Sequence, residues 1–116
     1  MLRDPRQIAV SVFNRHPREV MARLEGVWEL LAGYLEDGVT AFYFHEFTTC
    51  PRSLQALVRW TGVDDVEVEA SWLELPVNAT RTPTITSYRQ IPESIRHAID
   101  PPIRRFLADY FPEQTA

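Results

Sequence analysis

Apolar residues at helical spacing predict a first helix close to the start of the chain. Asp4 is suited to the N-cap of this helix, and Pro5 to its first position, where no backbone N–H is needed. The apolar side of the helix consists of Ile8, Val12 and Phe13. We expect the helix to end near Asn14, because Pro17 follows closely and disfavours its continuation.

The strongest periodicity in the chain covers residues 20–35. Its apolar residues fall on one stripe: Val20, Met21, Leu24, Val27, Trp28, Leu31 and Leu35. This spacing predicts one continuous amphipathic helix with Trp28 in the core, because the stripe repeats about every 3.6 residues. Asp37-Gly38 predicts the turn that ends the helix.

A segment of β-branched and aromatic residues, VTAFYFHEF, occupies positions 39–47. Its inner part, residues 40–44, is apolar on both alternating faces, which predicts a strand that is covered on both sides. A single strand cannot form a sheet, and the remaining sequence offers few segments that could pair with it. The pattern therefore predicts a strand whose pairing within this chain is incomplete.

A third helix is predicted directly after this strand. Thr49 or Cys50 would be its N-cap, Pro51 would lie in its first turn, and Gly62 would end it. The acidic segment at positions 63–78 follows, and we expect a loop there with at most a short strand or turn.

A last helical region is predicted from Pro92 to Tyr110. Its apolar positions are Ile95, Ala98, Ile99, Ile103, Phe106 and Leu107. We expect an interruption at Pro101-Pro102, because proline inside a helix lacks the N–H that the preceding turn requires. The predicted order is helix, helix, strand, helix, loop, helix.

Composition and charge narrow the classes of function. A chain of 116 residues suffices for one domain, and its net charge of −4 argues against a broadly basic surface for nucleic acid. No apolar run approaches the length of about 20 residues that spans a membrane. Cys50 is the single cysteine, so an intrachain disulfide is excluded and the cytoplasm is the default location. All twelve basic residues are arginine, so any chemistry that needs a lysine must come from another chain or segment.

The opening residues combine an arginine, a helix cap and a serine at a suggestive spacing. Ser11 follows Asp4 by seven residues, about two helical turns, and therefore returns to nearly the same side of the helix. Arg3 precedes the cap, so its planar guanidinium and the Ser11 hydroxyl could converge on a phosphate. From the residues alone, a solvated arginine and an ordinary helical serine are the alternative.

The segment LRDPRQIAVS resembles the 3′-phosphate-binding segment of the sulfotransferases that use 3′-phosphoadenosine 5′-phosphosulfate. In that family a buried strand leads into Arg-[Asp/Asn]-Pro-[Arg/Lys], and a serine follows the first arginine by eight residues. Arg3 and Ser11 stand at this separation, with Asp4-Pro5-Arg6 between them. Met1-Leu2 would then be the last residues of the strand.

The resemblance continues along roughly residues 1 to 112. FYFHEF followed by PRSLQALVRWTG is similar to the family's next strand and helix, whose spacing is kept by Leu54, Leu57, Trp60 and Gly62. Pro51 lies one residue closer to Leu54 than is usual in the family. His45-Glu46-Phe47 stands where the family often has Tyr-Glu-Asp, which puts an adenine contact there in doubt. Asn78-Ala79-Thr80-Arg81 is similar to a later loop of the family.

The resemblance implies an α/β protein: the C-terminal portion of a P-loop-like sulfotransferase fold, mostly helical as present, with one or two strands. Residues 1–116 would form a single partial domain, without the loop that binds the 5′-phosphosulfate. The co-substrate would be 3′-phosphoadenosine 5′-phosphosulfate. Arg3 and Ser11 would hold its 3′-phosphate, with Arg6 or Arg81 nearby, and no metal is expected.

The implied activity is transfer of a sulfuryl group to the hydroxyl or amine of an acceptor that the sequence does not identify. The catalytic groups would lie in the preceding segment. We expect the N-terminal half or a second copy as protein partner, because an apolar strand and helix stripe would otherwise be exposed. Neither nucleic acid nor a membrane is expected as a partner. The alternative is a catalytically silent, α-rich interaction module that kept this half of the fold.

Other candidate residues carry weaker signals. His16, His45 and His97 are far apart and lack the spacing of metal ligands. His45 beside Glu46 suggests either an acid–base pair or a structural histidine. The carboxylates at positions 64, 65, 67 and 69 do not fit an EF-hand loop, which favours a solvated acidic edge.

Overall fold

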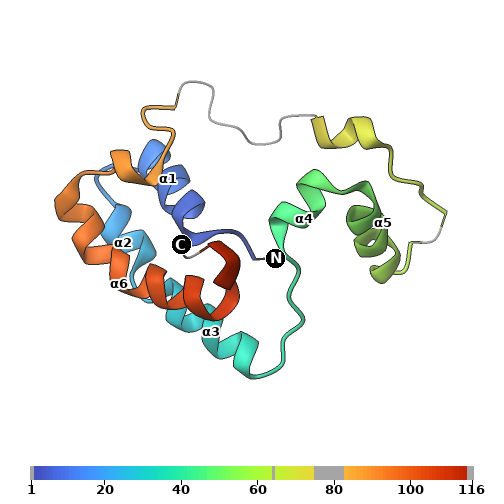
Figure 1. Cartoon of the computed structure of the whole chain (residues 1–116), viewed down its shortest axis with the longest axis horizontal. Helices are drawn as coiled ribbons and strands as arrows, with labels where there is room; N and C mark the ends of the chain where they lie inside the picture. The colour runs from blue at the N-terminus through green and yellow to red at the C-terminus, as the bar shows by residue number, and fades with distance from the viewer. Residues whose placement is uncertain (1, 64, 75–82, 115–116) are drawn as a thin grey trace. The chain divides into compact units, whose positions relative to one another are not determined.

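The computed structural model of the chain describes residues 2–63, 65–74 and 83–114, and these residues are mostly helical, as expected (Figure 1). Contacts divide the chain into two compact units. Unit 1 contains the described residues of Met1–Arg3 and Ala41–Ala79, and unit 2 those of Asp4–Thr40 and Thr80–Ala116. Within the described ranges, no helix is both long enough and apolar enough to cross a bilayer.

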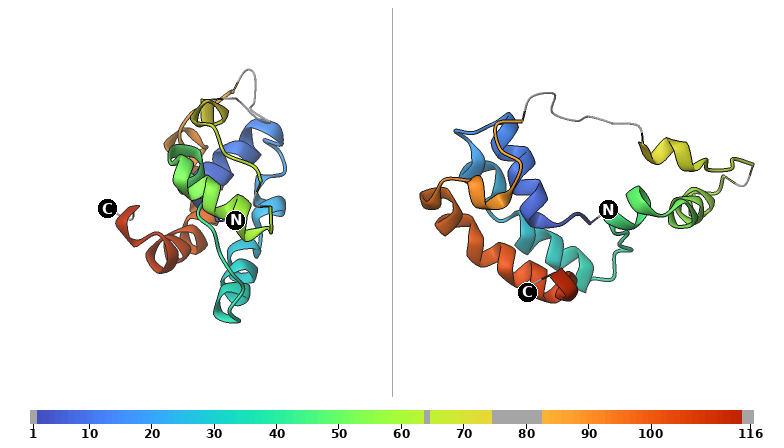
Figure 2. Two further views of the ribbon diagram at one scale, coloured as in Figure 1. Left: turned by 90° about the vertical axis from the view of Figure 1, so that its right-hand side faces the viewer. Right: turned by 45° about the horizontal axis from the view of Figure 1, so that its top comes forward.

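Unit 2 is a helical assembly in which the longest helix contacts all the others. Its elements are α1 (Pro5–Arg15), α2 (Val20–Leu24), α3 (Val27–Glu36), α6 (Glu93–Tyr110) and the 3₁₀ turns η2 (Tyr88–Gln90) and η3 (Pro112–Gln114). α6 packs against α1, α2 and α3, and Figures 1 and 2 show α3 and α6 side by side. The core side chains of unit 2 include Val20, Leu24, Trp28, Ile91, Ile99, Ile103, Phe106, Leu107 and Phe111. Burial of these apolar side chains is the main stabilising contribution within the unit.

Helix α1 forms where the sequence predicts it, and its first turn is capped as expected. The Asp4 carboxylate accepts a hydrogen bond from the backbone N–H of Arg6 at 2.8 Å. Pro5 occupies the first helical position, where its missing N–H costs no intrahelical bond. The helix ends at Arg15, one residue beyond the expected Asn14.

The second predicted helix is wrong as one continuous element. The structure ends α2 at Leu24 and begins α3 at Val27. Gly26 separates them in the left-handed region, with φ of 71°, which glycine adopts without a steric penalty. Val20, Leu24 and Trp28 are nonetheless all buried, so the break redirects the stripe without exposing these three residues.

Helix α6 is continuous across Pro101-Pro102, where the sequence predicts an interruption. These prolines cannot donate hydrogen bonds to the carbonyls of His97 and Ala98, four residues earlier in each case. The apolar stripe extends through the site, since Ile99 and Ile103 on either side are 4% and 1% exposed. Packing of this stripe against α1, α2 and α3 outweighs the local loss of backbone hydrogen bonds.

Unit 1 is built from α4 (Phe44–Thr49), α5 (Pro51–Trp60) and the 3₁₀ turn η1 (Ala70–Glu74). α4 packs against α5 and against η1. An aromatic cluster links its elements: the Phe42 ring lies 5.7 Å from that of the buried Phe47 and 5.0 Å from that of Trp60, between centroids, and Trp60 itself is 64% exposed. Such tilted and edge-to-face contacts contribute to stability beyond area burial alone.

The predicted strand at 40–44 is wrong in most of its extent. Only Tyr43 is paired, in an isolated parallel bridge with Leu2, and a helix begins at the next residue. The Leu2 N–H donates to the Phe42 carbonyl at 2.5 Å, and the Phe44 N–H donates to the Leu2 carbonyl at 2.6 Å. Because Tyr43 is the only paired residue of this segment, the backbone that follows it cannot continue as a strand. It forms its hydrogen bonds within helix α4 instead.

The structure confirms the predicted start and end of helix α5. Cys50 is the N-cap residue, Pro51 follows at the first position, and Gly62 comes two residues after the last helical residue with φ of 94°. The side chain of Gln55 then holds the following segment, because it accepts from the Val68 N–H at 2.7 Å and donates to the Val66 carbonyl at 2.9 Å. The predicted loop therefore lies against α5 before it enters η1.

Candidate functional site

Arg3 lies at the junction between the parallel bridge and the start of helix α1. The two hydrogen bonds of Leu2 hold the backbone beside Phe42 and Phe44. The Arg3 side chain is exposed, and its Cζ lies over the Phe44 ring, 5.0 Å from the centroid. This distance is within the range of a cation–π interaction, which the sequence did not indicate.

The side chain of Arg6 binds Asp4, the N-cap residue of α1. Its Nε and Nη2 donate to the two oxygens of Asp4 at 3.2 and 2.8 Å. The hydrogen bond from Asp4 raises the pKa of Arg6 above its ordinary value, and partial burial acts in the opposite direction. Two of the guanidinium N–H groups are therefore committed to Asp4, so Arg6 serves mainly to brace the helix start.

Ser11 lies in the middle of α1 and is half-buried. Since α1 is helical from Pro5 to Arg15, Ser11 returns to the side of Asp4 to within about 20° after two turns. Arg6 and Ser11 belong to unit 2, whereas Arg3 belongs to unit 1. Arg81, the remaining predicted site residue, lies outside the described residues.

The segment that resembles the adenine-contacting part of the family is helical. His45, Glu46 and Phe47 form the first turns of α4, which corrects their expected place at the end of a strand. Phe47 is 7% exposed and packs against the Phe42 ring in the aromatic cluster of unit 1, whereas His45 and Glu46 are exposed. Phe47 is therefore a packing residue.

A polar cluster that the sequence did not reveal joins η2 to α6. The Tyr88 hydroxyl donates to Asp100 Oδ1 at 3.0 Å, and Arg104 pairs with the other oxygen of Asp100. Burial first, and then the hydrogen bond to Asp100, raise the pKa of Tyr88 far above its ordinary value. The phenol therefore stays protonated and acts as a hydrogen-bond donor that fixes η2 on α6.

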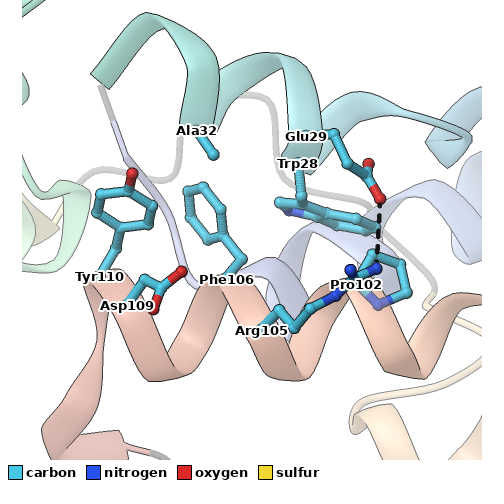
Figure 3. A pocket seen from close by; sticks show the side chains of 8 residues that line it. All are labelled: Trp28, Glu29, Ala32, Pro102, Arg105, Phe106, Asp109 and Tyr110. Carbon is cyan, nitrogen blue, oxygen red and sulfur yellow. Dashed lines mark ion pairs between the residues drawn. The ribbon is translucent and has the colours of Figure 1, made fainter. Parts of the chain in front are cut away.

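A small open groove of about 160 Å³ lies between α3 and α6 (Figure 3). It is lined by Trp28, Glu29, Ala32, Pro102, Arg105, Phe106, Asp109 and Tyr110. Glu29 and Arg105 face each other at 3.8 Å across one end, and the Phe106 and Tyr110 rings lie 4.7 Å apart between centroids. Trp28 and Phe106 are almost fully buried, so these two side chains expose little aromatic surface in the groove.

In the part of the chain that the structure describes, no group of three or more histidine, cysteine or carboxylate side chains comes together. The single thiol, Cys50, is half-buried at the start of α5, where the backbone and side chain of Ser53 lower its pKa.

No family model, curated protein or solved structure compared with the chain matches it. Of the candidates above, Arg3 alone combines a charged, exposed donor group with a position at the start of a capped helix.

Proposed function

We propose that this chain provides the 3′-phosphate-binding part of a sulfotransferase that uses 3′-phosphoadenosine 5′-phosphosulfate. The observation that carries the proposal is the position of Arg3. It stands between a residue paired in parallel, Leu2, and a helix capped by Asp4. In the resembling family the arginine of the opening motif stands between a strand and a helix, and here an isolated bridge takes the place of the strand.

The chemistry of the two motif side chains suits a phosphate monoester. The guanidinium of Arg3 carries several N–H donors in one plane, and the Ser11 hydroxyl supplies one more donor. A phosphate offers strong acceptor oxygens and a double negative charge, so each charge-assisted hydrogen bond contributes about 1.5–3 kcal/mol. The resemblance implies this role, contact with the ribose 3′-phosphate, for both residues.

The proposed reaction is an in-line displacement at sulfur. The bond between sulfur and the 5′-phosphate oxygen breaks, a bond from sulfur to the acceptor oxygen or nitrogen forms, and the acceptor proton passes to a base. As in phosphoryl transfer, catalysis depends on positioning and on stabilisation of charge. Arg3 and Ser11 would position the nucleotide. The base and the cation that stabilises the sulfuryl group are not assigned to residues of this chain.

Isothermal titration with adenosine 3′,5′-bisphosphate tests the proposal directly. We expect the chain to bind this nucleotide, and Arg3→Ala to weaken binding by about 10-fold or more, which corresponds to the loss of one charged hydrogen bond. Arg6→Ala is a matched control, because Arg6 is committed to Asp4, and should change affinity less than about twofold. Absence of binding by the unmodified chain, or equal affinities for it and Arg3→Ala, would contradict the proposal.

A second candidate is a catalytically silent interaction module, which exposed apolar residues on α3 favour. Leu30 and Tyr34 are 59% and 51% exposed and lie one turn apart on this helix. Self-association without nucleotide binding would support this candidate. Analytical ultracentrifugation of the chain, with and without the bisphosphate, separates the two candidates.

A further inference from the structure

Three exposed apolar side chains lie on helix α3 or directly after it. Leu30 and Tyr34 are one turn apart on this helix and are 59% and 51% exposed. Val39 follows the end of the helix and is 54% exposed. We call these three residues the α3 ridge, and all of them belong to unit 2.

The backbone turn at the end of α3 returns Val39 to the helix. The Val39 N–H donates to the Tyr34 carbonyl, and the Gly38 N–H donates to the Leu35 carbonyl, each at 3.1 Å. This pair of hydrogen bonds is the Schellman motif, in which the residue after the glycine comes back to the last turn of the helix. Val39 therefore extends the row that Leu30 and Tyr34 begin.

The core of unit 2 uses the other side of α3. Trp28 is 2% exposed, and α3 packs against α2 and α6. Leu30 comes two residues after Trp28, which places it about 200° around the helix. A surface helix normally has polar residues opposite its buried side, whereas α3 has apolar residues there as well. Such an exposed apolar row is typical of an interaction surface.

The charged residues that accompany the α3 ridge are all acidic. From position 25 to position 44 the chain has four carboxylates, at 25, 29, 36 and 37, and no basic residue. All four are exposed. Glu29 faces Arg105 of α6 at 3.8 Å, and its side chain remains 55% exposed (Figure 3). The carboxylates of Glu36 and Asp37 lie at the end of the helix, between Tyr34 and Val39 in sequence.

We propose that the α3 ridge binds an amphipathic helix of a partner protein, one with an apolar side and with arginine or lysine beside it. Apolar residues one helical turn apart are the pattern that packs against the apolar side of a second helix. Basic residues on the partner complement Glu36 and Asp37. A second copy of α3 would bring like charges together, and an anionic membrane surface would be repelled. The inference goes beyond the proposed function and involves none of its motif residues.

Isothermal titration with two synthetic helical peptides tests the partner's chemistry. The probe has leucine at helical spacing and arginine at the remaining positions, and the control peptide has glutamate in place of arginine. We expect the arginine peptide to bind, and the glutamate peptide to bind at least about 10-fold more weakly because its charges repel those of α3. Absence of binding by the arginine peptide up to about 1 mM, or equal affinities for the two peptides, would overturn the proposal.

Variants of the α3 ridge distinguish it from general attraction between an acidic chain and a basic peptide. Leu30→Gln should weaken binding of the arginine peptide by about 5-fold or more, because it removes an apolar contact. Tyr34→Gln is a second variant with the same expected effect, and circular dichroism confirms that each variant folds. Val63→Gln changes an apolar residue of unit 1 that is 40% exposed and should alter affinity by less than about twofold. Unchanged binding by both ridge variants would refute the proposal.

Two further measurements identify what else could cover the α3 ridge. Glu36→Gln combined with Asp37→Asn should weaken the arginine peptide and reduce the salt dependence of its binding. Analytical ultracentrifugation should find the unmodified chain monomeric without peptide. A dimer that Leu30→Gln dissociates would assign the ridge to a second copy and overturn the proposal. Leu30→Gln should not change the affinity for adenosine 3′,5′-bisphosphate, so the two proposals succeed or fail separately.

Discussion

The side chain of Asn14 forms two hydrogen bonds with the backbone of Ile85, 71 residues away in the sequence. Its Nδ2 donates to the Ile85 carbonyl at 3.0 Å, and its Oδ1 accepts from the Ile85 N–H at 2.9 Å. The amide thus satisfies both backbone groups of a residue whose side chain is 7% exposed. The pair ties the end of α1 to the segment that leads into η2, within unit 2.

Asn14→Ala should therefore destabilise unit 2. The change leaves a partly buried donor and acceptor of Ile85 without their partner, which costs about 1–3 kcal/mol of unfolding free energy. Urea denaturation followed by circular dichroism measures the difference. Arg18→Ala, at an exposed turn position, is the control and should shift stability by less than about 0.5 kcal/mol. A stability equal to that of the unmodified chain would show that these hydrogen bonds do not hold the segment.

Pro101→Ala should stabilise helix α6. Alanine at this exposed position restores an N–H that can donate to the His97 carbonyl, and alanine is favoured over proline by about 3 kcal/mol in a helix interior. Removal of the proline also gives the unfolded chain more conformational freedom. This favours unfolding by about 0.4–1 kcal/mol and offsets part of the gain. Thermal unfolding checks the result. Pro92→Ala, at the N-cap of the same helix, should give no gain, and a less stable Pro101→Ala variant would contradict the prediction.

Loss of the Tyr88 phenol proton should destabilise the fold at alkaline pH. Its pKa is raised in the folded chain, so folding favours the neutral phenol. This contribution is complete below the ordinary tyrosine pKa of about 10 and is lost as pH rises above that value. Tyr88→Phe should cost about 0.5–1.5 kcal/mol near neutral pH and flatten the decline above pH 10.

Ultraviolet absorbance of the phenolate checks this prediction directly. The difference between the unmodified chain and Tyr88→Phe isolates the ionisation of Tyr88, which should occur well above the ordinary tyrosine pKa of about 10. Ionisation of Tyr88 near that ordinary pKa would argue against the hydrogen bond to Asp100.

Cys50 should react with iodoacetamide at a lower pH than an unperturbed cysteine does. The backbone and side chain of Ser53 lower the pKa of its thiol, which increases the thiolate fraction near neutrality. The pH dependence of alkylation, followed by mass spectrometry, gives the midpoint. Ser53→Ala should raise this midpoint, whereas Thr49→Ala should not, because the Thr49 hydroxyl donates to the His45 carbonyl. A midpoint equal to that of the denatured chain would refute the effect.

The elements that the sequence predicted correctly are those whose signals are local. The Asp4-Pro5 start of α1 depends on residues within one turn, as do the Pro51 start of α5 and the Gly62 stop. Caps and prolines act on the backbone next to them, so their effect can be inferred without knowing the rest of the fold. The eight-residue spacing of Arg3 and Ser11, on which the proposed function depends, can likewise be seen in the sequence without knowing the fold.

Tertiary structure decided the features that depend on distant partners. Residues 40–44 were expected in a strand, but a strand needs neighbours for its backbone groups, and only Leu2 supplies them in the described chain. α6 continues through two prolines because its apolar stripe packs against three other helices. The contact of Arg3 with Phe44 likewise requires chain segments far apart in sequence to meet. Local propensity is weak compared with burial, so contacts between distant segments determined these outcomes.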